Sequence, residues 1–357
     1  MIRPSQIARI GKDEQPSSKD IIRSRSPLRI SFVGGGTDLA HWYNEYPGAT
    51  LSCTINKYAY ASLYPREDHE VHINSYALGY SVKYKLAQEP VYDGVLDLAK
   101  ATIKRLGSSQ GMELDLRTDA PPGSGLGGSS ALTSAIIGVM ASYTGKILSK
   151  YELAELNYQI ERSDIGIKGG KQDQYATTFG GFNLMEFYSD RVVVNPLRID
   201  QDIINDLEAH ILLCYTGRAR SNLGLIDKQI SLYQNGIEDT LKGMKRLYEM
   251  VFEMKEALLR GNLDDLGYML NEAYINKKMM NPDIARGTIV DQLYDEALKQ
   301  GALGGKLLGA GGGGYLMLYC ETARQFGVRR ALEAMGGQFT DFSFEPLGLQ
   351  SWRSGSK

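Results

Sequence analysis

A glycine- and serine-rich segment in the first half of the chain has the composition of a phosphate-binding loop. It reads PPGSGLGGSSA at residues 121–131 and runs directly into an apolar stretch of helical period. Successive glycines let backbone N–H groups approach an anion, and the N-terminus of the following helix favours negative charge. Ser129 and Ser130 could add hydroxyl ligands to a phosphate or its Mg²⁺. A flexible turn with a serine N-cap is the simpler alternative, but it does not need four glycines.

The same segment also fits a dinucleotide-binding fingerprint. Gly123, Gly125 and Gly128 have the G-x-G-x-x-G spacing, after an expected strand and before an expected helix. That fingerprint requires a second strand about 20 residues later that ends in an acidic residue. Residues 145–163 have helical character instead, so the context disfavours an NAD-dependent oxidoreductase. Walker A and protein-kinase motifs do not occur in the sequence.

Two further glycine-rich segments lie near the two ends of the chain. Residues 27–38 read PLRISFVGGGTD, in which an expected strand carrying Arg29 leads through three glycines to Thr37 and Asp38. Residues 306–315 read KLLGAGGGGY. Taken singly, the first could be a tight turn and the second a hairpin turn.

An acidic and glycine-containing segment completes the set of candidate residues. Residues 161–175 read ERSDIGIKGGKQDQY, with Glu161 and Asp173 as the carboxylates of interest. Phosphoryl transfer needs an acceptor for the proton of the attacking hydroxyl and cations that offset charge. Asp173 could be that acceptor and Arg29 could orient it. The alternative for both carboxylates is an ordinary surface position.

The elements that must position these residues alternate between strand and helix patterns. Strands are expected at 28–33, within 49–64 and 70–84, and at 112–117, 181–187, 191–199, 210–215 and 339–344. Helices are expected at 91–106, 131–143, 153–160, 221–260, 263–278, 288–299 and 322–335. We therefore expect an α+β protein with a leader at 1–25 and two domains at 26–200 and 201–357.

Composition excludes several classes of function. The 357 residues carry 40 Lys and Arg against 42 Asp and Glu, a net charge of −2, which gives no reason to expect nucleic acid or an anionic membrane as a partner. No apolar run is long enough to span a membrane. Cys53, Cys214 and Cys320 are far apart and read as reduced thiols of a cytoplasmic protein.

Together, the three glycine-rich segments resemble the motifs of the GHMP kinase superfamily (galacto-, homoserine, mevalonate and phosphomevalonate kinases), in the same order. The resemblance extends from about residue 27 to residue 344. It implies a ribosomal protein S5 domain 2-like N-terminal domain and a ferredoxin-like C-terminal domain, with ATP bound between them. It also implies Asp173 and Arg29 as catalytic residues and Glu161 with Ser129 or Ser130 as Mg²⁺ ligands.

The resemblance further assigns binding residues. For ATP these are Pro122, Gly123, Gly125, Leu126, Gly127, Gly128, Ser129, Ser130 and Ala131. For the substrate they are Thr37, Asp38, Lys168, Gly169, Gly170, Lys171, Arg218, Arg220, Gly311 and Gly312.

One departure from the family pattern bears on the substrate. Many members have Glu-His where this chain has Gly35-Gly36, which argues against galactose. Residues 27–38 and 169–175 are most similar to the branch that phosphorylates heptose phosphates, and Lys168, Lys171, Arg218 and Arg220 could hold a substrate phosphate. We expect a sugar phosphate and ATP as substrates. Another sugar kinase, a non-catalytic nucleotide sensor and the oligomeric state remain open, as does whether Asp173 acts as a base or only positions the hydroxyl.

Overall fold

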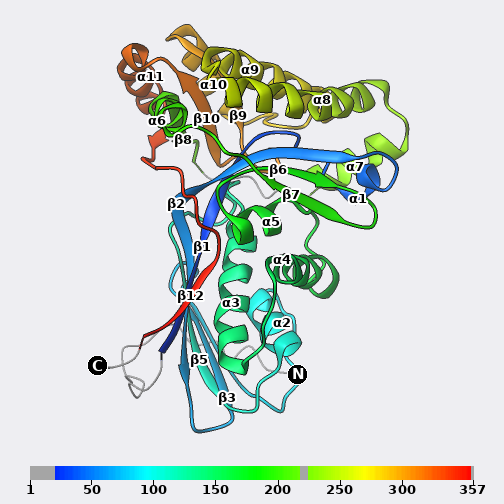
Figure 1. Cartoon of the computed structure of the whole chain (residues 1–357), viewed down its shortest axis with the longest axis vertical. Helices are drawn as coiled ribbons and strands as arrows, with labels where there is room; N and C mark the ends of the chain where they lie inside the picture. Colours follow the sequence, from blue (N-terminus) through cyan, green and yellow to red (C-terminus); the bar gives the residue numbers. More distant parts are fainter. Residues whose placement is uncertain (1–20, 218–223, 355–357) are drawn as a thin grey trace.

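The computed structural model describes residues 21–217 and 224–354 and consists of two sheets with their covering helices (Figure 1). The first sheet has eight strands in the order β12-β1-β2-β5-β3-β4, with β6 paired to β2 and β7 paired to β6. All of its pairs are antiparallel except β3–β5. Its strands are β1 (Ile21–Val33), β2 (Gly48–Pro65), β3 (Glu70–Ser75), β4 (Tyr80–Lys85), β5 (Met112–Thr118), β6 (Phe182–Phe187), β7 (Val192–Pro196) and β12 (Gln350–Ser354).

The long strand β2 connects the two halves of this sheet. Its residues 59–65 pair with β5, and its residues 48–53 pair with β6. In Figure 1 β1 and β2 run from the lower part of the molecule up to the second sheet. The glycine-rich residues that follow β1 are therefore carried to the junction between the two parts.

Several helices accompany the first sheet. They are α1 (Ala40–Tyr43), α2 (Asp97–Leu106), α3 (Gly128–Thr144), α4 (Lys150–Gln159), the π-helical turn Ile160–Asp164 and α5 (Gln172–Phe179). α3 packs against β1, β2, α2 and α5, so it is buried on most sides and its sequence is apolar nearly all round. α4 begins at Ser149, whose side chain forms a capping box with Glu152.

The second sheet has four antiparallel strands in the order β11-β8-β10-β9. They are β8 (Ile211–Tyr215), β9 (Ala302–Leu307), β10 (Tyr315–Cys320) and β11 (Gln338–Phe339). Its accompanying helices are α6 (Gln201–His210), α7 (Leu225–Gln234), α8 (Glu238–Arg260), α9 (Leu263–Met280), α10 (Val290–Lys299) and α11 (Thr322–Ala334). Methionine and leucine residues recur every three or four positions along α8, and this face packs against α9.

Several elements differ from the expected ones. β1 begins at Ile21, and β12 pairs with it, so residues 21–25 and 350–354 belong to the first sheet and not to a leader or a separate C-terminal domain. The expected helix 221–260 is divided, because Gly236 with φ +65° ends α7 before α8 begins. The helix expected from residue 91 begins at Asp97, and α5, α6 and β12 were not expected at all.

The dinucleotide-binding alternative does not fit this topology. α3 is followed by α4 and the π-helical turn, where a Rossmann unit needs its second parallel strand. The G-x-G-x-x-G spacing at residues 123–128 therefore belongs to a different kind of loop.

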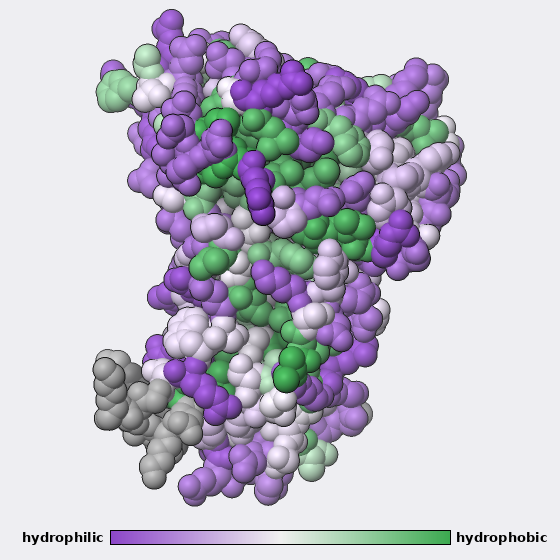
Figure 2. All heavy atoms as spheres, in the orientation of Figure 1, coloured by the Kyte–Doolittle hydropathy of each residue, from purple (hydrophilic) through white to green (hydrophobic). Residues whose placement is uncertain are grey.

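The visible surface is mainly polar. Figure 2 shows apolar atoms along the middle of this face, from the upper part through the waist, between polar flanks. In the part of the chain that the structure describes, no helix has both the length and the apolar character needed to cross a membrane.

Candidate active site

Arg29 connects three of the segments singled out in the sequence. It lies on β1 with 2% of its surface exposed. Its Nε and Nη2 donate to Asp173 Oδ1 at 2.7 and 2.6 Å, and its Nη1 donates to the carbonyl of Gly125 at 2.5 Å. Its backbone N–H also donates to the carbonyl of Leu126 at 3.0 Å. Strand, central glycine loop and acidic segment thus meet at one guanidinium group.

Asp173 lies in the first turn of α5, and its side chain keeps 23% of its surface exposed. Gly127 lies directly beside the pair: its φ is +72°, and a Cβ there would meet Arg29 Cγ at 3.2 Å and Asp173 Cγ at 3.5 Å. Glycine is needed at this position for both conformation and space. The carboxylate is therefore fixed on one side by Arg29 and open to a ligand on another.

Ser130 and Glu161 form a second polar pair, behind the start of α3. Ser130 Oγ lies 3.0 and 3.1 Å from the two carboxylate oxygens of Glu161, whereas Ser129 is exposed and points to no such partner in the described chain. Glu161 is fully buried, and this burial raises its pKa. Gln174 Nε2 donates to it at 2.5 Å, and Arg162 Nη1 lies 3.0 Å away.

This pair has suitable chemistry for Mg²⁺, which prefers hard oxygen ligands and retains phosphate oxygens and water in its coordination shell. Within residues 21–217 and 224–354, no group of three or more His, Cys, Asp or Glu could hold a metal. A Mg²⁺ at Ser130 and Glu161 would thus depend on the phosphates of a nucleotide for its remaining ligands.

Asp38 holds the acidic segment against the turn after β1. Its Oδ1 accepts from the N–H of Gly36 at 2.9 Å, and its Oδ2 accepts from the N–H of Gln172 at 3.2 Å. Burial raises the pKa of this carboxyl, with a further contribution from the charge of Asp173. Thr37 is fully buried, and its hydroxyl group contacts the backbone of Gly34 and Ala49. In this structure Thr37 holds the turn, which differs from the substrate contact expected of it.

The C-terminal glycine segment contacts the central loop. A Cβ at Gly125 would lie 2.6 Å from the carbonyl of Leu308, and the N–H of Tyr315 donates to the carbonyl of Ser124 at 3.0 Å. Gly311 and Gly312 are buried in the turn between β9 and β10. Residues 306–315 thus form a β-hairpin whose turn also supports the loop at residues 123–128.

Of the four cations expected to hold a substrate phosphate, the two that the structure describes pair with different carboxylates. Lys168 is 65% exposed and lies 3.3 Å from Asp227 on α7. Lys171 is 13% exposed, lies 3.5 Å from Glu155 and stands over the ring of Tyr158. Gly169 and Gly170 lie between them, packed against Arg162 and Asp38. Arg218 and Arg220 lie outside the described residues.

Two buried lysines that the sequence reasoning missed lie near the same junction. Lys277 on α9 donates from Nζ to the carbonyls of Leu307 at 2.9 Å and Gly309 at 2.6 Å. Lys306 on β9 donates to the carbonyl of Phe32 at 3.1 Å. Burial lowers the pKa of both, that of Lys277 to about 7, and the nearby charge of Arg29 adds to the effect. A signal did exist for Lys277, because it continues the buried stripe of Leu266, Leu270 and Ala273 along α9.

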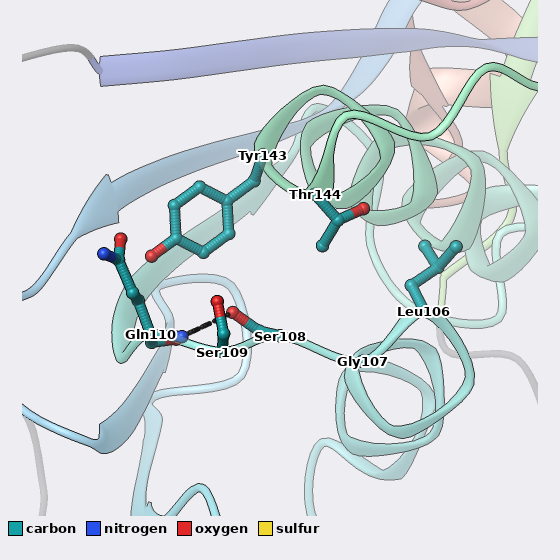
Figure 3. A pocket seen from close by; sticks show the side chains of 7 residues that line it. All are labelled: Leu106, Gly107, Ser108, Ser109, Gln110, Tyr143 and Thr144. Atoms are coloured by element: carbon teal, nitrogen blue, oxygen red, sulfur yellow. Dashed lines mark hydrogen bonds between the residues drawn. The ribbon is translucent and has the colours of Figure 1, made fainter.

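A cavity of about 370 Å³ lies elsewhere, between the C-terminal ends of α2 and α3 (Figure 3). It is lined by the turn at residues 106–110 and by Tyr143 and Thr144. None of the glycine-rich segments reaches it. The candidate active site is instead the junction of the central loop, the turn after β1 and α5.

Comparison with known proteins identifies the family. The sequence matches the GHMP kinases N terminal domain over residues 93–181 and the GHMP kinases C terminal domain over residues 254–338. It is 37% identical over 338 residues to D-glycero-alpha-D-manno-heptose 7-phosphate kinase of Campylobacter jejuni, covering 93% of this chain and 99% of the relative. The chain belongs to the GHMP kinase family.

Solved structures of GHMP kinases agree with this assignment. A D-glycero-D-manno-heptose 1-phosphate kinase from Bacteroides thetaiotaomicron is 31% identical with a TM-score of 0.79, covering 94% of this chain and all of the other. A Lactococcus lactis galactokinase complexed with galactose has a TM-score of 0.75 at 22% identity, covering 93% and 95%, and shares the fold. The expected two-domain GHMP kinase fold is confirmed, and this protein is a sugar kinase, a phosphotransferase with an alcohol group as acceptor.

Proposed function

We propose that this GHMP kinase transfers the γ-phosphate of ATP to the anomeric hydroxyl of D-glycero-D-manno-heptose 7-phosphate and yields the 1,7-bisphosphate. The observation that carries the proposal is the Arg29–Asp173 pair beside the central glycine loop. The similarity to a heptose 7-phosphate kinase over nearly the whole of both chains supports the choice of sugar. GHMP kinases use ATP as their phosphate donor.

In this mechanism the anomeric oxygen forms a bond to the γ-phosphorus while the bond from that phosphorus to the ADP oxygen breaks. Asp173 accepts the proton that the hydroxyl loses, and Arg29 fixes the carboxylate and offsets charge on the transferring group. Backbone N–H groups of residues 123–128 and the N-terminus of α3 bind the triphosphate. Ser130 and Glu161 would hold a Mg²⁺, which supplies charge neutralisation when bound.

The position of the existing phosphate is the main point to test, since the names of the two heptose kinases specify 7-phosphate and 1-phosphate, respectively. ADP release should be measured with heptose 7-phosphate, heptose 1-phosphate, unphosphorylated heptose, fucose and galactose, and the product identified by ³¹P NMR. We expect the highest kcat/KM with heptose 7-phosphate and a new phosphate on the anomeric carbon. An equal or higher kcat/KM with a free sugar or with the 1-phosphate would overturn the assignment of the substrate.

A further inference from the structure

Two glutamine side chains face the glycine turn at the end of β1. A Cβ at position 35 would lie 3.5 Å from Gln172 Nε2, and a Cβ at position 36 would lie 2.9 Å from Gln229 Nε2. Gln172 begins α5 and Gln229 lies on α7, so the two amides reach the turn from elements that are far apart in the sequence. Because glycine has no side chain, the amides of these two glutamines come close to the backbone of the turn.

We propose that Gln172 and Gln229 bind hydroxyl groups of the sugar and so determine which sugar the kinase accepts. This inference rests on the proposed function as a sugar kinase, and it adds two residues to which the sequence motifs assign no role. It places the sugar along the turn at residues 35–38, next to the Asp173 carboxylate.

Unpartnered polar atoms are the first support for this inference. Among the residues that the structure describes, Gln172 Oε1 and Gln229 Nε2 are both buried without a hydrogen-bond partner. Gln229 is only 6% exposed. A buried polar group without a partner destabilises a fold, so such groups point to a partner that binds later. One of these atoms accepts and the other donates, which together match the two capacities of a hydroxyl group.

The position of these atoms relative to the reacting groups is the second support. The backbone N–H of Gln172 donates to Asp38 Oδ2, and Gln172 directly precedes Asp173. The Gln172 side chain therefore leaves α5 from the same first turn as the carboxylate that would accept the proton. Gln229 lies on the other side of the turn, where Met280 also packs over Gly36.

The charge of the surroundings favours hydroxyl groups over a phosphate. The ring of His41, on α1, packs edge-to-face against the ring of Tyr233, which lies one turn along α7 from Gln229. Neither ring nitrogen of His41 has a hydrogen-bond partner in the described chain. Burial lowers the pKa of His41 to about 4, so the ring is neutral at pH 7 and offers one donor and one acceptor. Two amides and a neutral imidazole can form hydrogen bonds with the hydroxyl groups of a polyol, whereas a phosphate calls for cations, and the nearby Lys168 and Lys171 already pair with Asp227 and Glu155.

The test replaces the amide without changing the size of the side chain. Gln229→Met should raise the KM for the sugar that the wild type turns over best by about five- to tenfold, the effect of losing one hydrogen bond to a hydroxyl. The KM for ATP should stay within twofold. Gln234→Met is the matched control, because Gln234 lies on the same helix but is exposed, and it should change neither constant. Gln172→Met should also raise the KM for the sugar. If Gln229→Met folds poorly, the KM of Gln172→Met tests the inference in its place.

A competition experiment separates hydroxyl from phosphate recognition. Unphosphorylated heptose should inhibit the wild type competitively against the sugar substrate, and Gln229→Met should raise its Ki by the same factor as the KM. An unchanged sugar KM in both glutamine variants, or an equal rise in the KM for ATP, would overturn the inference. A loss confined to phosphorylated sugars would show that the glutamines bind phosphate and would overturn the assignment to hydroxyl groups. The heptose assignment is tested separately by the substrate panel, which uses only the wild-type enzyme.

Discussion

At the scale of single residues, the candidate chemistry rests on Asp173, which is held by Arg29 and remains partly exposed. A carboxylate in this position can accept the proton of the attacking hydroxyl, and Arg29 prevents it from turning away. The neighbouring pair of Ser130 and Glu161 is buried and is separate from Asp173 in its hydrogen bonds. We therefore expect substitution of Asp173 and substitution of Ser130 or Glu161 to affect the reaction in different ways.

Asp173→Asn keeps the size of the side chain but removes its capacity to accept a proton. We expect kcat to fall by about 10² to 10⁴, the usual contribution of a positioned general base, with ATP affinity within a few-fold of the wild type. Steady-state kinetics and ATP titration measure the two quantities. Asp202→Asn is the control, since Asp202 lies in the first turn of α6 as Asp173 lies in the first turn of α5. More than half of the wild-type kcat in Asp173→Asn would remove this residue from the mechanism.

Gly127→Val tests the central loop. A side chain here would press on both Arg29 and Asp173, and it would force a residue with φ +72° out of its favoured region. We expect thermal stabilisation by Mg-ATP in the wild type and its loss in the variant. Gly145→Val is matched for strain, because Gly145 has φ +70° but open space around it. That control should lower the Tm and still show the shift with Mg-ATP, and loss of the shift in both variants would contradict a specific role for Gly127.

At the scale of elements, α9 and the β9–β10 hairpin support the central loop of the site from the side of the second sheet. Lys277 spans this junction from α9 to the carbonyls of Leu307 and Gly309. A neutral amine has two N–H groups, which these two carbonyls satisfy. Burial lowers the pKa of Lys277 and the nearby charge of Arg29 adds to this effect, whereas hydrogen bonds to carbonyl oxygens by themselves favour the charged amine.

This arrangement predicts how stability depends on pH. Because the folded-state pKa of Lys277 is about 7 and its ordinary value is 10.5, the unfolded chain binds more protons between these two values. The free energy of unfolding should then rise with pH from about 7 toward 10, by at most about 1.4 kcal/mol per pH unit from this group. Lys277→Met should remove this contribution, as measured by urea unfolding at pH 7 and pH 9. Lys278→Met is the neighbouring control, since Lys278 is 38% exposed and pairs with Asp291. Identical slopes for wild type and Lys277→Met would contradict the assignment.

At the scale of the whole molecule, the end of the described chain returns to its beginning. β12 pairs with β1 over residues 350–354, and Leu349 packs into the core beside α3. Ser351 also lies so close to Gly138 of α3 that a Cβ there would meet its hydroxyl at 2.5 Å. The chain therefore crosses between the two sheets twice, from β7 to α6 and from β11 to β12.

Truncation measures the importance of this return. Deleting residues 349–357 should expose the edge of β1 and remove an apolar contact from α3, and we expect a fall in Tm of several degrees by calorimetry. Deleting residues 355–357 alone is the control and should leave the Tm within about one degree. Equal Tm values for the two truncated chains would show that β12 contributes no stability.

The sequence by itself determined the family and the three glycine-rich segments, because these depend on local patterns, and through the resemblance it predicted roles for Arg29, Asp38, Glu161 and Asp173. A run of glycines before an apolar helix predicts an anion-binding loop wherever the chain carries it. The sequence also predicted most strands and helices from their periodicity, with errors at Ile21, Asp97 and Gly236, where pairing or a turn overrides the pattern.

Only the tertiary structure decided which groups meet. In the structure Ser130, and not Ser129, contacts Glu161, and Lys171 lies beside Glu155. Lys277, Gln172 and Gln229 lie against the glycine segments. These contacts join residues tens to hundreds of positions apart, and no local pattern specifies them. The physical reason is that hydrogen bonds and burial depend on distance in space, which packing of the two sheets and their helices sets.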